Sequence, residues 1–165
     1  MNPLLNKESV KRAEKAIKAF NSNLEIICLE KTARTAQDAA TALGCNVGAI
    51  VKSLLFKTED NFILCLVSGD KRCSLNKLRN ILNIKDVSMA HPDEVKKITG
   101  YTIGGVSPVG HLTKIKIYID STLKRFTTVF AAAGHPNCVF KISFNKLINL
   151  TSGKIRNLSE WDNQN

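Results

Sequence analysis

A lysine inside an apolar segment is the first residue of this sequence whose type invites chemistry. Residues 49–56 read Ala-Ile-Val-Lys-Ser-Leu-Leu-Phe. Strand alternation places Lys52 on one face with three apolar side chains, those of Ile50, Leu54 and Phe56. A buried ammonium is unfavourable unless a negative charge uses it, and such conflicts are typical of functional sites. The alternative is a lysine at a strand edge that extends its charge to solvent.

A glycine-rich segment is the second candidate. Residues 100–110 read Gly-Tyr-Thr-Ile-Gly-Gly-Val-Ser-Pro-Val-Gly, with four glycines, one proline and no charged residue. Glycine allows backbone angles that other residues avoid and lets a ligand approach the main chain, while proline restricts its own φ and the residue before it. Such a loop can direct amides and carbonyls at a small polar group. A tight connection between a helix and a strand is the alternative interpretation.

Two further polar residues are weaker candidates. Asp120 follows an expected strand, where its carboxylate could reach a cleft or could cap a helix over residues 121–125. His135 lies in a turn and could line a pocket. The cysteines at positions 28, 45, 65, 73 and 138 form no Cys-x-x-Cys pair, and the three histidines have no ligand spacing. We therefore expect no metal site, no disulfide framework and no cofactor.

The chain is strongly basic. Its 24 lysines and arginines against 14 acidic residues give a net charge of +10 in 165 residues. This charge favours a nucleic-acid partner, although lysine also serves solubility. The aromatic content of 6% argues against a stacking platform for long single strands. No apolar run is long enough to span a membrane, and residues 1–5 do not resemble a signal peptide. We expect a cytoplasmic protein without a membrane partner.

Helices and strands must position these candidates. Helical periodicity and capping residues predict helices over residues 6–20 (capped by Asn6), 36–43 (capped by Thr35), 75–82 (capped by Ser74), 92–99 and 144–150 (capped by Ser143). Apolar runs predict strands over residues 25–29, 49–57, 62–68, 86–89, 115–119, 127–133, 138–142 and 154–158. The strands over 49–57 and 62–68 form a hairpin and, being nearly all apolar, are expected to be central. Since helices and strands do not alternate strictly, the pattern predicts one α+β domain with a mixed sheet, followed by a frayed tail.

These features together resemble the YbaK family of aminoacyl-tRNA deacylases, whose domain also occurs within bacterial prolyl-tRNA synthetases. The resemblance covers residues 35–158 in a single domain of residues 1–165. Its landmarks are Val51-Lys52-Ser53-Leu54, Ser68-Gly69-Asp70, Thr99-Gly100-Tyr101, Gly104-Gly105-Val106-Ser107-Pro108, Ile119-Asp120 and Ala132-Ala133-Gly134. Lys52 matches the family's invariant lysine, and residues 104–108 match its Gly-x-x-x-Pro loop.

The resemblance implies a mixed, partly barrel-like sheet flanked by helices. It also implies hydrolysis, without a metal, of the ester that joins a wrongly chosen amino acid to the tRNA acceptor end. Prolyl-tRNA synthetase is a partner that it suggests. Lys52 would stabilise charge, at the developing oxyanion or at the terminal phosphate. The implied substrate-binding residues are Ser53, Gly104, Gly105, Val106, Ser107, Pro108, Asp120, Ala132, Ala133, Gly134 and His135.

One departure bears on the substrate. Members that clear cysteine often carry a small hydroxyl residue just before the glycine that Gly134 matches, whereas residues 131–133 are all alanine. The sequence therefore favours a small aliphatic acyl group, alanyl or 2-aminobutyryl, over cysteinyl. A non-catalytic module that binds or regulates tRNA is the alternative function. The intact Lys52 and glycine loop argue against it.

Overall fold

The computed structural model describes residues 2–31 and 33–162. Its helices are η1 (Pro3–Asn6), α1 (Glu8–Phe20), α2 (Ala36–Leu43), η2 (Val47–Ala49), α3 (Leu75–Leu82), α4 (Pro92–Thr99), η3 (Ser121–Arg125) and α5 (Phe144–Thr151), where η denotes a short 3-10 helix. Its strands are β1 (Ile27–Cys28), β2 (Ile50–Thr58), β3 (Phe62–Ser68), β4 (Lys71–Cys73), β5 (Val87–Met89), β6 (Lys116–Asp120), β7 (Thr128–His135), β8 (Cys138–Ser143), β9 (Lys154–Arg156) and β10 (Ser159–Trp161).

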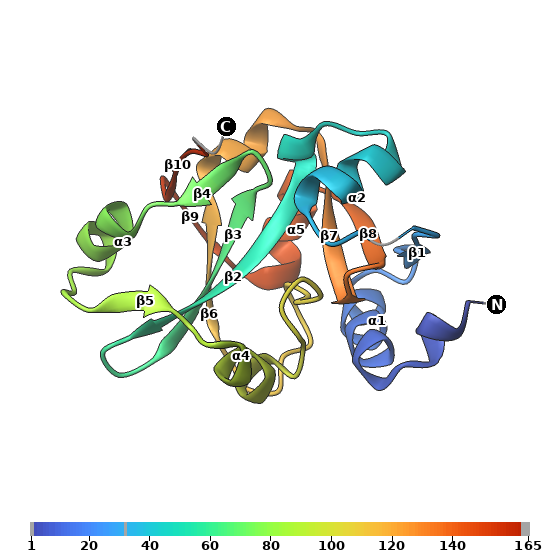
Figure 1. Cartoon of the computed structure of the whole chain (residues 1–165), viewed down its shortest axis with the longest axis horizontal. Helices are drawn as coiled ribbons and strands as arrows, with labels where there is room; N and C mark the ends of the chain where they lie inside the picture. The colour runs from blue at the N-terminus through green and yellow to red at the C-terminus, as the bar shows by residue number, and fades with distance from the viewer. Residues whose placement is uncertain (1, 32, 163–165) are drawn as a thin grey trace.

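A mixed sheet forms the centre of the fold. Its strand order is β1-β8-β7-β2-β3-β6-β9, and β5 pairs with β2 beside this path. The β2–β3 hairpin is antiparallel, whereas β2–β7, β3–β6 and β6–β9 are parallel pairs. Figure 1 shows β2 running through the middle of the molecule. The predicted α+β class with a mixed sheet flanked by helices is confirmed, and along the described chain the sheet is open, ending at β1 and β9.

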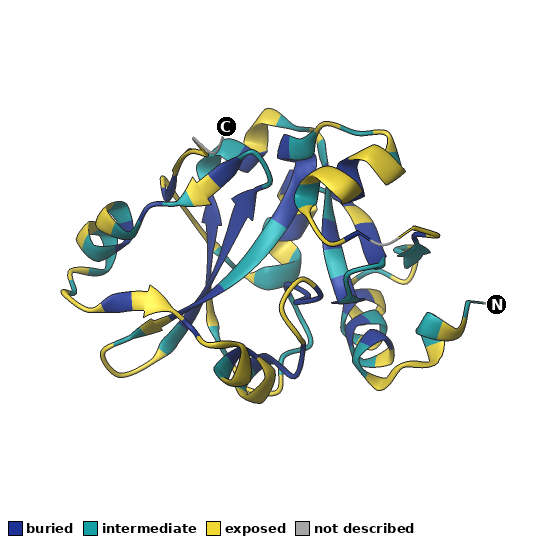
Figure 2. Cartoon of the chain, viewed as in Figure 1, coloured by how far each residue is buried: buried dark blue, intermediate teal, exposed yellow. Residues whose placement is uncertain are grey.

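The hydrophobic core lies on both faces of β2 and β3. Leu55 and Leu64 pack with α1 and α5 on one face, and Phe56 and Cys65 pack with α3 on the other. A third cluster lies between α2, β1 and β8. Figure 2 shows the central strands largely buried and the outward faces of the helices exposed. Burial on both faces explains why β2 and β3 are almost continuously apolar in sequence.

Most helix ends follow the predicted capping chemistry. The hydroxyls of Thr35, Ser74 and Ser143 accept hydrogen bonds from backbone amides in the first turns of α2, α3 and α5. Gly44 and Gly100 end α2 and α4 in the left-handed conformation. These helix boundaries are therefore set by local signals within one turn of the chain.

Three expectations about the elements were wrong. Asn6 does not cap α1, because it ends η1 and the helix begins after Lys7 without a side-chain cap. The first strand is shorter than residues 25–29, since only residues 27–28 pair with β8. The tail is ordered through residue 161, where β10 pairs with β4 in a separate two-stranded sheet that was not expected from the sequence.

Candidate active site

The candidate site lies where one edge of β2 has no strand beside it. Along this edge β7 pairs with residues 50–51 and β5 pairs with residues 56–58. Residues 52–55 pair with β3 on the opposite edge, but no described strand pairs with them on this one. Ala90 N donates to Leu55 O at 3.0 Å, which shows that the Leu55 carbonyl points out of this edge. Because backbone groups alternate in direction along a strand, the N–H and C=O of Ser53 point into the same gap.

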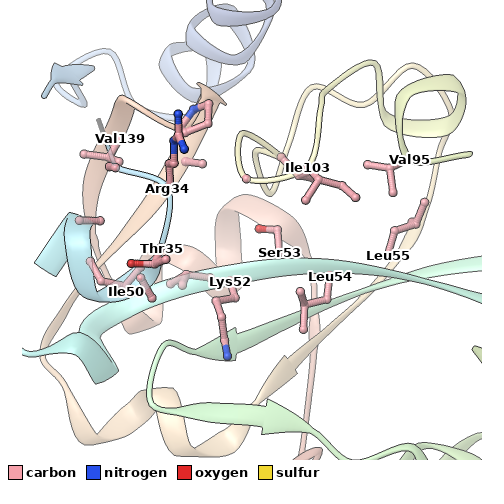
Figure 3. Close-up of a pocket in the computed structure, with 18 of the residues that line it drawn as sticks. Arg34, Thr35, Ile50, Lys52, Ser53, Leu54, Leu55, Val95, Ile103 and Val139 are labelled. Carbon is pink, nitrogen blue, oxygen red and sulfur yellow. The ribbon is translucent and has the colours of Figure 1, made fainter. Parts of the chain in front are cut away.

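A pocket of about 310 Å³ occupies this gap. Its lining is mainly apolar, and it is contributed by the segment before α2, α2 itself, β2, β5, α4, the glycine loop, β7 and β8. The residues are Ala33, Arg34, Thr35, Ala36, Ala39, Ile50, Val51, Lys52, Ser53, Leu54, Leu55, Met89, Ala90, Val95, Ile103, Gly104, Val106, Phe130, Ala132, Pro136 and Val139. Figure 3 shows how the labelled residues surround β2. An apolar pocket with few polar groups is typical of a small-ligand site.

Ser53 presents an unused hydroxyl in this pocket. Its Oγ is buried and has no hydrogen-bond partner among the described residues. In Figure 3 its side chain points to the side of β2 on which Ile103 lies. Buried hydroxyls nearly always have a partner, so an orphan in a pocket lining indicates a place for a polar group of a ligand. With its backbone amide and carbonyl, Ser53 offers both donors and acceptors there.

Lys52 extends to the other side of β2, away from Ser53 and toward the β3–β4 connection (Figure 3). Its side chain is half-buried, and Nζ donates a hydrogen bond to the carbonyl oxygen of Lys71. Burial lowers the pKa of Lys52, and the negative charges of Asp162 and Asp70 partly offset this effect. Lys52 therefore belongs to the pocket lining, but its ammonium lies on the opposite side of β2 from the Ser53 hydroxyl.

The glycine loop approaches the pocket through its first half. Gly104 lines the pocket and has φ +90°, where a Cβ would meet only Pro136, whose Cγ would lie 3.4 Å away. Gly105 instead lies against backbone, since a Cβ there would be 2.8 Å from His135 Cα. Ser107 and Pro108 are buried outside the lining, and Ser107 Oγ accepts from Val109 N at 3.2 Å. Of the predicted loop residues, Gly104 and Val106 thus line the pocket, and the others shape the loop.

Arg12 of α1 holds both ends of this loop. Its Nη2 donates to Gly100 O at 2.8 Å and its Nε donates to Gly110 O at 2.9 Å. The guanidinium also lies 4.6 Å from the ring centroid of the buried Tyr101, whose hydroxyl donates to Val109 O at 2.9 Å and contacts Gly110 O at 3.1 Å. Helix α1 therefore positions the loop, a role that no pattern in the sequence indicated.

We expect Arg12→Met to loosen the loop. Hydrogen bonds to charged groups contribute about 1.5–3 kcal/mol each, so the melting temperature should fall. Cleavage of the aminoacyl ester that the family resemblance implies as substrate should drop about tenfold, corresponding to roughly 1.4 kcal/mol, mainly through KM because the loop is assigned to positioning. Lys11→Met, an exposed neighbour on the same helix, is the control. An Arg12→Met variant that melts earlier yet cleaves normally would show that the contact is only structural.

The alanines of β7 divide between core and pocket. Ala131 and Ala133 are buried in the core, whereas Ala132 pairs with Val139 and both line the pocket. Of the predicted residues here, only Ala132 faces the pocket. Gly134 has φ +92°, and its missing side chain makes room for α1, since a Cβ would lie 2.5 Å from Ser9 O.

His135 and Asp120 lie outside the pocket lining. His135 Nδ1 accepts from Asn137 N at 3.0 Å, and burial lowers the pKa of the imidazole. Asp120 is fully buried, and its carboxylate accepts from Leu158 N at 2.8 Å, from Ser159 N at 3.1 Å and from Ser159 Oγ at 2.7 Å. It also caps η3, as one of the two interpretations predicted. Asp120 thus fastens the C-terminal segment.

Comparison with known proteins identifies the domain. Residues 30–150 match the family described as the aminoacyl-tRNA editing domain, which is more than half of the chain. The chain belongs to this family. The uncharacterised protein YwhH of Bacillus subtilis is 32% identical to this chain over 148 residues. The aligned segment covers 89% of this chain and 94% of YwhH. The crystal structure of a candidate trans-editing enzyme for prolyl tRNA synthetase has 37% identity and a TM-score of 0.89, covering 93% of this chain and 98% of that one.

Proline–tRNA ligases match the editing domain over a shorter segment. The ligase of Fervidobacterium nodosum is 40% identical over 91 residues, which is 55% of this chain but 16% of the ligase. The shared segment is therefore a small part of each ligase. Within the described residues, no group of three or more His, Cys, Asp or Glu side chains could hold a metal ion, and no helix is long and apolar enough to cross a membrane.

Several pocket residues of the editing domain carried no sequence signal. Arg34 is exposed at the pocket and directly precedes the cap of α2, where no motif marks it. Phe130 and Val139 come from strands whose inward positions depend on a bulge that shifts the β7–β8 register between residues 132 and 135. Ile103 is different, because a large apolar residue within a glycine-rich loop is visible in the sequence. In the structure its side chain is 57% exposed.

Proposed function

We propose that this editing domain is a trans-editing hydrolase that clears a wrongly attached amino acid from a tRNA, with tRNA-Pro as the expected carrier. The observation that carries the proposal is the open edge of β2, where the unpartnered Ser53 hydroxyl faces an apolar pocket and Lys52 extends from the opposite side of the strand. The similarity to a candidate trans-editing enzyme and to proline–tRNA ligases supports the choice of tRNA. Such a reaction belongs in the cytoplasm, where aminoacyl-tRNA is made.

The proposed chemistry is attack of water on the ester carbonyl, assisted by the neighbouring ribose hydroxyl. The bond to the ribose oxygen breaks, this oxygen leaves as the free hydroxyl by taking up a proton from the attacking water, and the amino acid is released. The carbonyl oxygen gains negative charge during the attack, so preorganised donors stabilise it. We assign the role of these donors to the amide and hydroxyl of Ser53, and the binding of the amino acid's ammonium to carbonyls of the glycine loop around Gly104. No residue is required as a covalent nucleophile and no metal is invoked.

The position of Lys52 favours one of its two predicted roles. Its ammonium lies across β2 from the Ser53 hydroxyl, so a contact with the phosphate of the terminal nucleotide fits better than a contact with the oxyanion. A compact, solvated ammonium is well suited to phosphate. In this arrangement β2 separates the acyl group in the pocket from the RNA backbone at its rim.

The decisive test of this function is direct. Purified protein is incubated with tRNA-Pro carrying a labelled wrong amino acid, and release of the label is followed. Release that depends on Lys52 supports a deacylase. Tight binding of the same tRNA without release would favour the alternative, a non-catalytic tRNA-binding module.

We expect the pocket to prefer small uncharged acyl groups. Ala132 presents a methyl, and Val106 and Val139 limit the size, so alanyl and 2-aminobutyryl esters should be cleaved better than cysteinyl. Since one methylene changes apolar discrimination by about 10–200-fold, the preference should be graded. Prolyl should be spared, because its ring removes an ammonium hydrogen that the loop carbonyls would bind.

A panel of tRNA-Pro charged with alanine, 2-aminobutyrate, serine, cysteine or proline measures this preference through kcat/KM. If kcat/KM were clearly highest for cysteinyl-tRNA, the Ser53 hydroxyl would be assigned to binding the substrate side chain instead of the developing oxyanion. Rapid prolyl cleavage would contradict editing itself.

A further inference from the structure

We propose that Trp161 forms a stacking site for a nucleobase of the RNA strand that carries the ester. The site lies outside the acyl pocket and would bind the single-stranded end of the acceptor strand. The choice of RNA rests on the proposed function. The stacking surface itself rests on the geometry of β10.

The ring of Trp161 is presented by an ordered segment. β10 pairs with β4 in the register Trp161↔Lys71, and Ser159, at the start of β10, is bound by the buried Asp120. Trp161 is nevertheless 58% exposed, which is unusual for a large aromatic side chain held in a strand. An exposed, positioned aromatic ring is the element on which proteins stack the bases of single strands.

Positive charges adjoin this ring. Lys71 Nζ lies 3.8 Å from the ring centroid and the Arg125 guanidinium lies 5.4 Å from it. Arg125 is oriented by Asp70, with Nη2–Oδ1 at 2.8 Å and Nη1–Oδ2 at 3.0 Å. Glu160, paired with Arg72, and Asp162 also lie in this segment, so the local charge is mixed within a chain of net charge +10. Lys71 is buried and Arg125 is exposed, so a stacked base with its phosphate beside Arg125 fits this combination better than an apolar peptide does.

Lys52 connects the pocket to this ring. Lys52 is one of the residues that line the pocket, and its ammonium donates to the carbonyl of Lys71, whose own side chain contacts Trp161. Figure 3 shows the Lys52 side chain leaving β2 on the side away from Ser53. The acyl pocket, Lys52 and Trp161 therefore follow one another in space. In the proposed complex the pocket binds the acyl group, Lys52 contacts the terminal phosphate, and Trp161 stacks on the base of a preceding nucleotide.

Trp161 is the only tryptophan of the sequence, so its fluorescence reports this site directly. The probe is an RNA hairpin that carries no amino acid and ends in a single-stranded CCA, labelled with fluorescein at its 5′ end for anisotropy. A blunt hairpin of the same stem is the control RNA. We expect saturable quenching of Trp161 by the CCA hairpin and little quenching by the blunt one.

Variants of Trp161 test how much the ring contributes to the affinity for the hairpin. Trp161→Leu should weaken binding of the CCA hairpin about tenfold, and Trp161→Phe, which keeps a ring, should lose less. Phe20→Leu removes a ring that is 40% exposed on α1 and should change nothing. Circular dichroism checks that each variant folds.

Three results would overturn the stacking site: no quenching when anisotropy shows saturation, equal Kd values for wild type and Trp161→Leu, or no binding of the hairpin at all.

The proposed function fails on a different result. If wild type releases no amino acid from mischarged tRNA but the hairpin quenches Trp161 and Trp161→Leu weakens binding, then the site stands and editing does not. Normal editing with an unchanged Kd in Trp161→Leu refutes the site alone.

Discussion

Replacing Lys52 by alanine is expected to lower kcat/KM for cleavage of a mischarged tRNA by about 10²-fold, or roughly 2.7 kcal/mol, because the variant loses a charged hydrogen bond to the terminal phosphate. The protein should remain folded. Burial already disfavours the charged form of this lysine, as its lowered pKa shows, and its ammonium donates to a single backbone carbonyl, that of Lys71. Losing this side chain therefore removes little folding free energy.

Lys57→Ala is the matched control for this variant. Lys57 lies on the same strand, is exposed, and pairs with Glu94 at 3.2 Å. Exposed ion pairs contribute about 0–1 kcal/mol, so neither stability nor cleavage should change much. Ester cleavage and the thermal melt are measured together for both variants. A folded Lys52→Ala protein with near-normal cleavage would remove Lys52 from the mechanism.

Replacing Gly104 by valine is expected to have the second largest effect. The residue has φ +90°, which a β-branched side chain adopts only with strain, and the valine would project into the pocket lining. A backbone displacement of about 1 Å at a site can cost about 10²-fold in rate. We therefore expect KM to rise and kcat to fall together, with a loss of stability of about 1–3 kcal/mol from the strain.

Gly44→Val separates strain from function. Gly44 ends α2 at φ +68°, and a Cβ added there would meet no described atom within 4 Å beyond its chain neighbours. Valine at this position therefore meets similar backbone strain away from the glycine loop. Steady-state kinetics and denaturant unfolding are compared for the two variants. If Gly44→Val reduces cleavage as strongly as Gly104→Val, the loss reflects stability and the loop has no specific role.

Much of the fold was predictable because its signals are local. The hairpin of β2 and β3 follows from two apolar runs around a polar turn, and Thr35, Ser74 and Ser143 mark helix starts through hydrogen bonds within one turn. The pairing of β4 with β10 was not predictable, because it joins two short strands that lie far apart in the sequence. Neither strand has a periodic pattern of its own.

The site was predictable only in part, because several of its features depend on how distant elements pack. Lys52 drew attention because it conflicts with its apolar neighbours, but alternation alone could not show that its ammonium points away from the pocket. Ala132 could not be chosen over Ala131 and Ala133 without the register of β7 against β8. Arg12 gave no signal, since its contacts with Gly100 and Gly110 depend on how α1 docks.

The open edge of β2 also bears on aggregation. Unpaired strand edges invite pairing with another copy of the chain and so promote fibril growth. On this edge of β2, only residues 52–55 lack a described strand beside them, because β7 pairs with the residues before them and β5 with the residues after them. A foreign strand would need more room than this short stretch offers. At this stretch the fold can thus expose unpaired backbone to a small ligand while offering little room for a growing fibril.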